Sequence, residues 1–412
     1  MVKNILFFIY IFIFSITAQY AGTIIVSPNG KNNSITKAIQ MAQARDKIVI
    51  KPGKYFENAI VIDKPLDIEG ELYPIIDANN KEGVFIVKSD SVTIKGLQIQ
   101  NIGMSQIDDR AGIKFFSVKK CLVENNKLIN TCFGIYFARS SDCVIRNNFV
   151  QGFATRETET GNAIHLFKCT HFLIENNTVS GHRDGIYFEF VENTKVCGNT
   201  SFKQIRYGMH FMFSHENEYY KNKFSNNGAG VAVMYSHHIY MHENEFSDNW
   251  SPVSNGLLLK DIKDSKIENN YIDRNTIGLF AEGCLRLEVK HNRFSKNGWA
   301  LKVLGDCYDN KFTENNFISN TFEVVTNATV SNNIFEHNYW SEYSGYDLNN
   351  DGIGDVPHSP VKLYTYLIER VPESIVLLRS LFIDLLNLAE KVAPVITPES
   401  LEDHKPAMKA IK

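Results

Sequence analysis

The stretch GMHFMFSHENEYYKN, residues 208–222, returns 22 residues later as GVAVMYSHHIYMHEN, residues 230–244, and the two align without a gap. Each contains a glycine, a short alternation of apolar and other residues, and a polar corner that ends in asparagine. Such alternation, broken by turn residues, predicts short β-strands and shows no helix-length periodicity. The fold therefore depends on whether the rest of the chain keeps this period.

Two series of short words keep the period along most of the chain. Strand words that start with glycine, such as GIYF, begin at residues 112, 134, 185, 208, 230, 256 and 278. A word close to ENN ends at Asn126, Asn148, Asn177, Asn199, Asn222, Asn244, Asn270, Asn292 and Asn316. Short strands and corners at a constant spacing predict an all-β fold, a right-handed parallel β-helix whose coils stack about 4.8 Å apart. Longer steps predict insertions at residues 152–162 and 249–255, and such loops usually border a binding face.

Helices are predicted at both ends of this solenoid. A short capping helix is expected from Ile35 to about Ala44, with Ser34 as its N-cap. A C-terminal amphipathic helix is expected from about Pro372 to Val392. Its charged residues indicate that it lies on protein or at an interface and does not span lipid; they are Arg379, Asp384, Glu390 and Lys391. Residues 397–412 are expected to form a tail that packs on this molecule or on a partner.

The first residues predict export from the cytoplasm. Lys3 precedes an apolar run from Ile5 to Ile16, and small residues follow at Ala18 and Ala21, which is typical of a secretory signal peptide. An uncleaved N-terminal anchor is the alternative. The predicted division is residues 1–21 as signal peptide, 22–340 as β-helix with its N-terminal cap, and 341–412 as an Asp-rich loop, helix and tail. A net charge of −3 gives no indication of a nucleic-acid partner.

The seven cysteines are an odd number, and none is part of a CxxC pair, so they define no complete disulfide framework. Cys121 and Cys143 are 22 residues apart and occupy equivalent positions in successive repeats. This equivalence favours two stacked, buried thiols over a structural disulfide.

Methionine and histidine concentrate in the two stretches quoted first. Between Met209 and His242 lie four of the eight methionines and five of the twelve histidines. Strand alternation directs Met209 inward and His210 and Met212 outward. The offset of one repeat then places Met212 next to Met234, and His215 next to His237.

Thioether sulfur together with imidazole favours copper, particularly Cu(I), over hard cations. The predicted copper ligands on this face are His210, Met212, His215, Met234, His237, His238, Met241 and His242. Ala232, the residue paired with His210, is expected to leave open space above that ring, and Tyr187 and His165 are expected to continue its column. The alternative for any one of these residues is an ordinary core methionine or a solvated surface histidine.

A possible calcium loop follows the last regular repeat. Asp347, Asn349, Asp351 and Asp355 match positions 1, 3, 5 and 9 of an EF-hand-like loop. Position 12 is His358 in place of the bidentate glutamate. The segment is therefore either a weak calcium site or a turn rich in Asx residues.

Four segments together resemble a known family: residues 38–71, the coils with GIYF and ENN, YGMHFMFSHENEYYKN at 207–222, and NYWSEYSGYDLNNDGIGDVPHSP at 338–360. The chain resembles the NosD family of nitrous oxide reductase maturation proteins. The resemblance implies a periplasmic, non-catalytic component that works with the membrane subunit of an ABC transporter and with a copper chaperone. It also implies that the protein supports assembly of the copper sites of nitrous oxide reductase.

Two other functions remain open from the residues alone. A polysaccharide lyase or hydrolase on this scaffold needs paired carboxylates, or a base with a charge-neutralising cation. The residues available for it are His182, Arg183, Asp184, Glu189 and Arg206. Asp184 precedes a corner glycine, so capping of that turn is its alternative role. The other possibility is a passive sugar-binding or adhesive solenoid.

Overall fold

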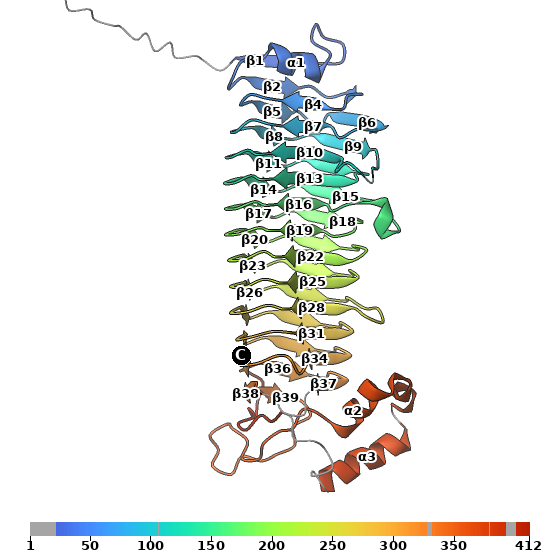
Figure 1. Ribbon diagram of the computed structural model, residues 1–412, viewed down its shortest axis with the longest axis vertical. Coiled ribbons are helices and arrows are strands. Elements are labelled where there is room, and N and C mark those ends of the chain that lie inside the picture. The colour runs from blue at the N-terminus through green and yellow to red at the C-terminus, as the bar shows by residue number, and fades with distance from the viewer. Residues whose placement is uncertain (1–21, 106, 328–331, 379, 393–400) are drawn as a thin grey trace, which may run out of the picture.

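The chain winds into one long solenoid whose walls are three parallel sheets, here called A, B and C (Figure 1). The computed structural model describes residues 22–105, 107–327, 332–378, 380–392 and 401–412. The predicted right-handed parallel β-helix is confirmed, with about 14 turns. Each coil contributes one strand to sheet B, one to sheet C and one to sheet A, in that order along the chain.

Sheet A has 14 strands. They are β1 (Thr23–Val26), β2 (Lys47–Ile50), β5 (Asp67–Gly70), β8 (Thr93–Lys95), β11 (Leu122–Glu124), β14 (Val144–Arg146), β17 (Leu173–Glu175), β20 (Lys195–Cys197), β23 (Glu218–Tyr220), β26 (Tyr240–His242), β29 (Lys266–Glu268), β32 (Glu288–Lys290), β35 (Lys311–Thr313) and β38 (Ile334–Glu336).

Sheet B has 13 strands. They are β3 (Lys54–Tyr55), β6 (Ile75–Lys81), β9 (Gln98–Ile102), β12 (Lys127–Ile129), β15 (Phe149–Gln151), β18 (Thr178–Ser180), β21 (Thr200–Phe202), β24 (Lys223–Ser225), β27 (Glu245–Ser247), β30 (Tyr271–Asp273), β33 (Arg293–Ser295), β36 (Asn316–Ile318) and β39 (Tyr339–Trp340).

Sheet C has 12 strands, most of them longer than those of the other sheets. They are β4 (Ile60–Ile62), β7 (Phe85–Val87), β10 (Ala111–Phe116), β13 (Phe133–Ala138), β16 (Ile164–Phe167), β19 (Ile186–Glu189), β22 (Tyr207–Met212), β25 (Ala229–Met234), β28 (Asn255–Lys260), β31 (Ile277–Glu282), β34 (Trp299–Val303) and β37 (Phe322–Val325). The long turns from sheet B to sheet C carry both predicted insertions. The first holds the 3₁₀ turn η1 (Glu157–Glu159), which projects beside β15 in Figure 1.

Alternation along each strand fills the interior with stacked apolar side chains. Phe188 of β19 and Phe211 of β22 are fully buried partners in register and meet edge to face, and Phe224 and Phe246 of sheet B are buried partners with stacked rings. Cys121 and Cys143 are free and buried, and the Cys121 N–H donates a hydrogen bond to the Cys143 Sγ at 3.3 Å. The expected pair of stacked thiols is therefore confirmed.

Buried asparagines form a ladder along the short turn from sheet A to sheet B. Each backbone N–H and side-chain Nδ2 donates to the Oδ1 of the next asparagine, as Asn244 does to Asn270 at 3.0 and 3.1 Å. The ladder runs through Asn126, Asn148, Asn177, Asn199, Asn222, Asn244, Asn270, Asn292, Asn315 and Asn338. Its member near the end is Asn315, not Asn316, because Asn316 already belongs to β36.

A second ladder lies at the turn from sheet B to sheet C. Gln204 donates to Asn227, and the series continues through Asn249, Asn275, Asn297 and Asn320. The sequence word ENN does not mark these positions. Between Gln204 and Asn320 the two ladders together fix the register of successive coils at two of their three corners.

The N-terminal end of the solenoid is covered by α1 (Ile35–Met41), which ends three residues earlier than predicted (Figure 1). Ser34 is its N-cap as expected, since its Oγ accepts a hydrogen bond from the Lys37 N–H. Ile35, Ala38 and Ile39 are buried against the first coil. Residues 1–21, with the predicted signal peptide, lie outside the described residues.

The single C-terminal helix predicted from Pro372 to Val392 is wrong in part. The structure has α2 (Leu363–Arg370), the 3₁₀ turn η2 (Pro372–Leu377) and α3 (Leu381–Val392). Pro372 favours the start of a new helical segment, which divides the predicted helix. The sequence did not predict α2 because the apolar stripe of that helix is short. Tyr364 and Ile383 pack with Phe322 of β37. No helix among the described ranges is long and apolar enough to cross a membrane.

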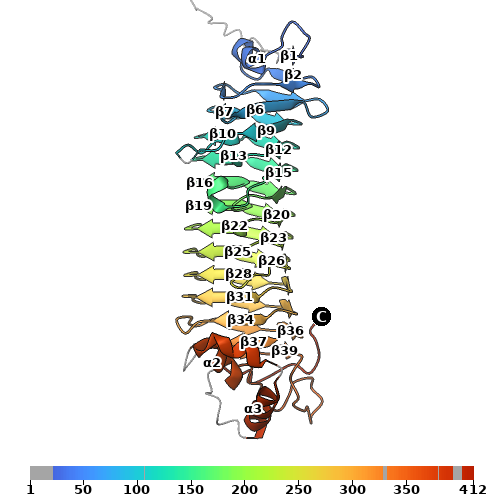
Figure 2. The ribbon, with the colours of Figure 1, turned by 90° about the vertical axis from the view of Figure 1, so that its right-hand side faces the viewer.

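Residues 401–412 return to the solenoid and cover its last coil (Figure 2). The Asp403 carboxylate continues the first asparagine ladder, because its Oδ2 accepts hydrogen bonds from the Asn338 N–H and Nδ2, both at 3.0 Å. The same oxygen accepts a hydrogen bond from the Trp340 Nε1–H at 3.0 Å. The tail therefore packs on this molecule.

Candidate metal site

The two thioethers expected to share one face do so on the outer surface of sheet C. Met212 ends β22, Met234 ends β25, and the two are partners in register. Met209 and Phe211 point into the core and are fully buried, whereas Met212 and Met234 are half-buried on the outside. Adjacent strands lie about 4.8 Å apart, so two flexible thioethers can converge on one ion.

Charged side chains border the methionine pair along the same column. Glu189 is the register partner of Met212 on one side, and Lys260 is the partner of Met234 on the other. Lys260 is paired with Glu282 at 3.2 Å. The methionines therefore form a neutral, soft patch between two charged positions.

His210 faces outward as predicted, but the open space expected above it is absent. It pairs with Ala232 in register, yet its exposed fraction is 3%. The rings of Tyr187 and Tyr207 lie 4.9 and 4.8 Å from the His210 ring and cover it. The repeat period predicts which face a residue is on, but not the size of the neighbours that close over it.

The ring nitrogens of His210 have no hydrogen-bond partner within the part of the chain that the structure describes. The Nδ1 atom lies 3.5 Å from the Oδ2 atom of the buried Asp184 carboxylate. His165 and Tyr187 continue the column, with ring centroids 4.8 Å apart. Burial lowers the pKa of His165 to about 3, and burial together with Glu189 raises the pKa of Tyr187 to about 12.

Three aromatic rings frame the methionines at the turn that leaves sheet C. Phe190, Phe213 and Tyr235 stack on one another, with centroids 5.4 and 5.0 Å apart. Each is at least 40% exposed. Phe213 and Tyr235 directly follow Met212 and Met234 in the chain.

The next residues of the same turn bring three histidines and a glutamate together. The His215 and His237 rings stack at 3.9 Å with 8° between their planes, as the offset of 22 predicts. His238 Nδ1 lies 2.8 Å from Glu216 Oε1 and 2.9 Å from His237 Nδ1. Glu216 was missed by the sequence analysis, although the same offset relates it to His238.

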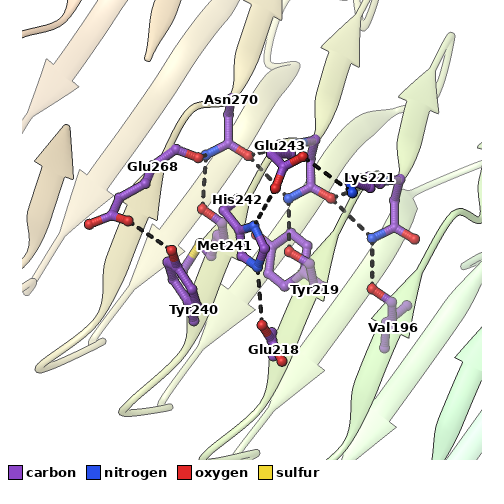
Figure 3. A network of polar contacts seen from close by, with 12 residues as sticks. Val196, Glu218, Tyr219, Lys221, Tyr240, Met241, His242, Glu243, Glu268 and Asn270 are labelled. Atoms are coloured by element: carbon purple, nitrogen blue, oxygen red, sulfur yellow. Dashed lines mark hydrogen bonds and ion pairs between the residues drawn. The ribbon is translucent and has the colours of Figure 1, made fainter. Parts of the chain in front are cut away.

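Met241 and His242 do not belong to this surface, and their inclusion among the copper ligands was wrong. Met241 is fully buried in the core, since β26 directs Tyr240 and His242 outward and Met241 inward. His242 lies on sheet A, where Glu218 and Glu243 contact its two ring nitrogens at 3.1 and 3.2 Å (Figure 3). Both nitrogens are engaged.

Known proteins are similar to this chain in the region that carries this surface. Residues 151–345 match the family model described as periplasmic copper-binding protein (NosD), and residues 22–157 match a right-handed β-helix region. The chain is similar to the probable ABC transporter binding protein NosD of Stutzerimonas stutzeri, at 25% identity, with 87% of this chain and 86% of the relative covered. The Pseudomonas aeruginosa relative of the same description is 26% identical, with 87% of both chains covered.

The chain is similar to the NosD family in this region and to the two NosD relatives over most of its length. The matched region 151–345 contains the methionine pair and the histidine turn. The family is described as periplasmic and copper-binding, and the two relatives are named as binding proteins.

Solved structures with the same fold include enzymes that act on polysaccharides. The A-module of mannuronan C-5 epimerase AlgE6 from Azotobacter vinelandii has a TM-score of 0.61 at 11% identity, with 73% of this chain and 94% of that chain covered. A family 28 exopolygalacturonase of Yersinia enterocolitica has a TM-score of 0.51 at 12% identity, with 75% and 78% covered. At this identity the likeness shows the fold alone.

The residues considered for a lyase or hydrolase are split between the interior and the surface. His182 is fully buried inside the coil, where its Nδ1 contacts the Ser180 carbonyl at 3.0 Å and its Nε2 lies 3.2 Å from the Thr131 hydroxyl. Asp184 is also buried, and its Oδ1 accepts a hydrogen bond from the Tyr207 N–H at 3.3 Å, which is the capping role that its position suggested. Arg206 lies outside, over the Tyr207 ring.

The Asp-rich loop uses its side-chain oxygens to fold its own backbone. Asp347 accepts hydrogen bonds from the Asp351 and Gly352 N–H groups, and Asn349 accepts one from Asp351. Asp355 accepts one from the Leu348 N–H at 2.7 Å. An ion would compete with these N–H groups for the same oxygens, and calcium binding here stays a prediction.

Proposed function

We propose that this protein binds Cu(I) at the outer surface of sheet C, between Met212 and Met234, and passes it on within a periplasmic assembly. The single observation that carries the proposal is the register pairing of these two half-buried methionines on the outer wall. The assembly would comprise an ABC transporter membrane subunit, a copper chaperone as donor and nitrous oxide reductase as recipient. The protein itself would be a non-catalytic accessory factor.

The chemistry of the pair suits transfer more than storage. Thioether sulfur is a neutral, soft ligand that prefers Cu(I) to hard cations. Two such ligands on an outer wall leave coordination positions of the ion open. The ion can therefore bind to Met212 and Met234 before the donor protein releases it. His210 lies two residues before Met212 on the same face and has free ring nitrogens among the described residues, but it needs displacement of Tyr187 or Tyr207 to reach solvent.

The C-terminal helices support the transporter part of the proposal. Leu381, Phe382, Leu385 and Leu388 of α3 are each more than half exposed, while Ile383 packs inward. An apolar face of this kind is typical of a protein contact. The relatives' description as probable ABC transporter binding proteins supports the same assignment.

The first experiment is a Cu(I) titration of the purified protein under anaerobic conditions. Met212→Leu combined with Met234→Leu is expected to weaken Cu(I) binding by at least about tenfold, since even outer-shell changes cost a metal site 10- to 100-fold. Met209→Leu with Met241→Leu is the matched control, because both of these methionines are core residues. Equal Cu(I) affinity in wild type and the Met212/Met234 variant would refute the placement.

Two further experiments test the partners. Leu385→Glu with Leu388→Glu is expected to prevent co-purification with the transporter membrane subunit, while Asp384→Ala on the same helix leaves it intact. Nitrous oxide reductase produced in cells without this protein is expected to lack its copper–sulfur cluster. A reductase from such cells that contains its full copper–sulfur cluster contradicts the assembly role but does not contradict the proposed Cu(I) site.

A further inference from the structure

Three side chains on the turn beyond the methionine pair converge closely enough to hold one ion. Glu216 Oε1 lies 2.8 Å from His238 Nδ1, and His238 Nδ1 lies 2.9 Å from His237 Nδ1. All three donor atoms lie within 4.8 Å of one another. Across the residues that the structure describes, this is the one group of three His, Cys, Asp or Glu side chains that approach so closely.

The repeat itself brings these residues together. Glu216 and His238 occupy equivalent turn positions in successive coils, and both have left-handed backbone angles, with φ of 55° and 53°. The Glu216 N–H donates to the His237 carbonyl at 3.2 Å, which fixes one turn on the other. His237 is held by its stack on His215. The backbone and one of the two imidazoles are thus ordered before any ion arrives.

Both short contacts within the group converge on the His238 Nδ1 atom. Two imidazole Nδ1 atoms at 2.9 Å form a stable contact only when one carries a proton, and the same His238 atom also faces a carboxylate oxygen. Zinc–nitrogen bonds of about 2.0–2.1 Å place tetrahedral ligand atoms about 3.4 Å apart. The two short distances to His238 therefore need to lengthen by only about half an ångström, while the Glu216 and His237 donors, which lie within 4.8 Å of each other, have to draw together for the three to enclose a cation.

We propose that Glu216, His237 and His238 form a second metal site that takes a borderline divalent cation, Cu(II) or Zn(II). Two imidazoles and one carboxylate favour these ions over Mg(II) and Ca(II), which prefer all-oxygen ligands, and over Cu(I), which prefers sulfur. Glu216 and His238 are about half exposed, so a fourth position stays open to solvent or to a ligand of a partner. This site uses no thioether and does not depend on the Cu(I) proposal.

The test is titration of the full chain with Cu(II) and, separately, with Zn(II) in competition with a chromophoric chelator. Glu216→Gln and His238→Asn are each expected to weaken binding of the divalent ion by at least about tenfold. His171→Asn is the matched control, because His171 has the same left-handed turn geometry three coils before His238, without a second histidine beside it. It is expected to leave the affinity unchanged.

Two outcomes distinguish this site from the thioether pair. Met212→Leu with Met234→Leu is expected to keep divalent binding, so loss of Cu(I) affinity alone in that variant leaves this proposal intact. Nitrogen hyperfine lines of bound Cu(II) are expected to report two imidazoles in wild type and one in His238→Asn. Binding of either divalent ion at equal strength by wild type, Glu216→Gln and His238→Asn overturns the proposal.

Discussion

Removing one rung of the first asparagine ladder is expected to destabilise the solenoid strongly. Asn270 is 2% exposed, and its Oδ1 accepts hydrogen bonds from the Asn244 N–H and Nδ2 at 3.0 and 3.1 Å. Its Nδ2 donates to the Met241 carbonyl at 2.9 Å, a contact visible in Figure 3. The ladder holds the coils in the register that places Met212 beside Met234.

Asn270→Ala leaves the buried Asn244 N–H and the Met241 carbonyl without these partners. A buried polar group that loses its partner costs about 1–3 kcal/mol, so the two together predict a loss of about 2–6 kcal/mol in the free energy of unfolding. Asn269→Gly is the control one residue away. Asn269 is exposed and has a φ of 56°, which glycine adopts freely, so a change below about 1 kcal/mol is expected.

The assay is urea denaturation followed by circular dichroism, together with amide hydrogen exchange. Coils of a solenoid contact only their neighbours, so faster exchange is expected in β26, β29 and β32 and not near α1. If Asn270→Ala unfolds within 1 kcal/mol of wild type, or if exchange rises equally along the whole chain, the ladder does not hold the register.

Three other outcomes are expected. Burial lowers the pKa of His182 to about 4, below its ordinary value near 6.5. Between these two pH values the unfolded chain binds more protons than the folded chain, so the free energy of unfolding falls as the pH drops below about 6.5. This group alone removes about 2 kcal/mol at pH 5, and denaturation at pH 7 and pH 5 should show that slope in wild type and not in His182→Gln. Asp403→Ala is expected to cost about 2–6 kcal/mol by leaving Asn338 and Trp340 donors unpaired, whereas Asp403→Asn keeps an acceptor oxygen; tryptophan fluorescence during unfolding compares them, and equal stability of the two variants would contradict the contact. In a thiol-labelling assay, Cys197, the one half-exposed cysteine of the seven, is expected to react first, with all seven reacting after unfolding; fewer than seven would indicate a disulfide.

The fold could be predicted from the sequence because the same residue pattern recurs along the chain. Asparagines and glycines recur at a spacing of about 22 residues, and one period gives both the fold and the neighbour of each residue in the next coil. The pairings of Met212 with Met234 and of His215 with His237 follow from that period alone. Both are found in the structure.

The incorrect predictions for individual residues concern features that the spacing of the repeats does not determine. Corner residues with left-handed backbone angles, such as Tyr235 and His238, interrupt strand alternation, so the inward direction of Met241 was not visible from the strand before the corner. The cover over His210 depends on the bulk of Tyr187 and Tyr207. Glu216 is a glutamate in a series otherwise marked by methionine and histidine, so only the repeat offset to His238 indicates it.

The last coil of the solenoid is covered by a segment that is synthesised much later than the coil itself. Every earlier coil is covered by the one that follows it directly, but the coil at Trp340 waits for Asp403, 63 residues further along the chain. Until that segment arrives, an unpaired sheet edge is available to any foreign strand. A chain that stops before Asp403 therefore keeps this edge unpaired, and we expect it to aggregate more readily than the full chain.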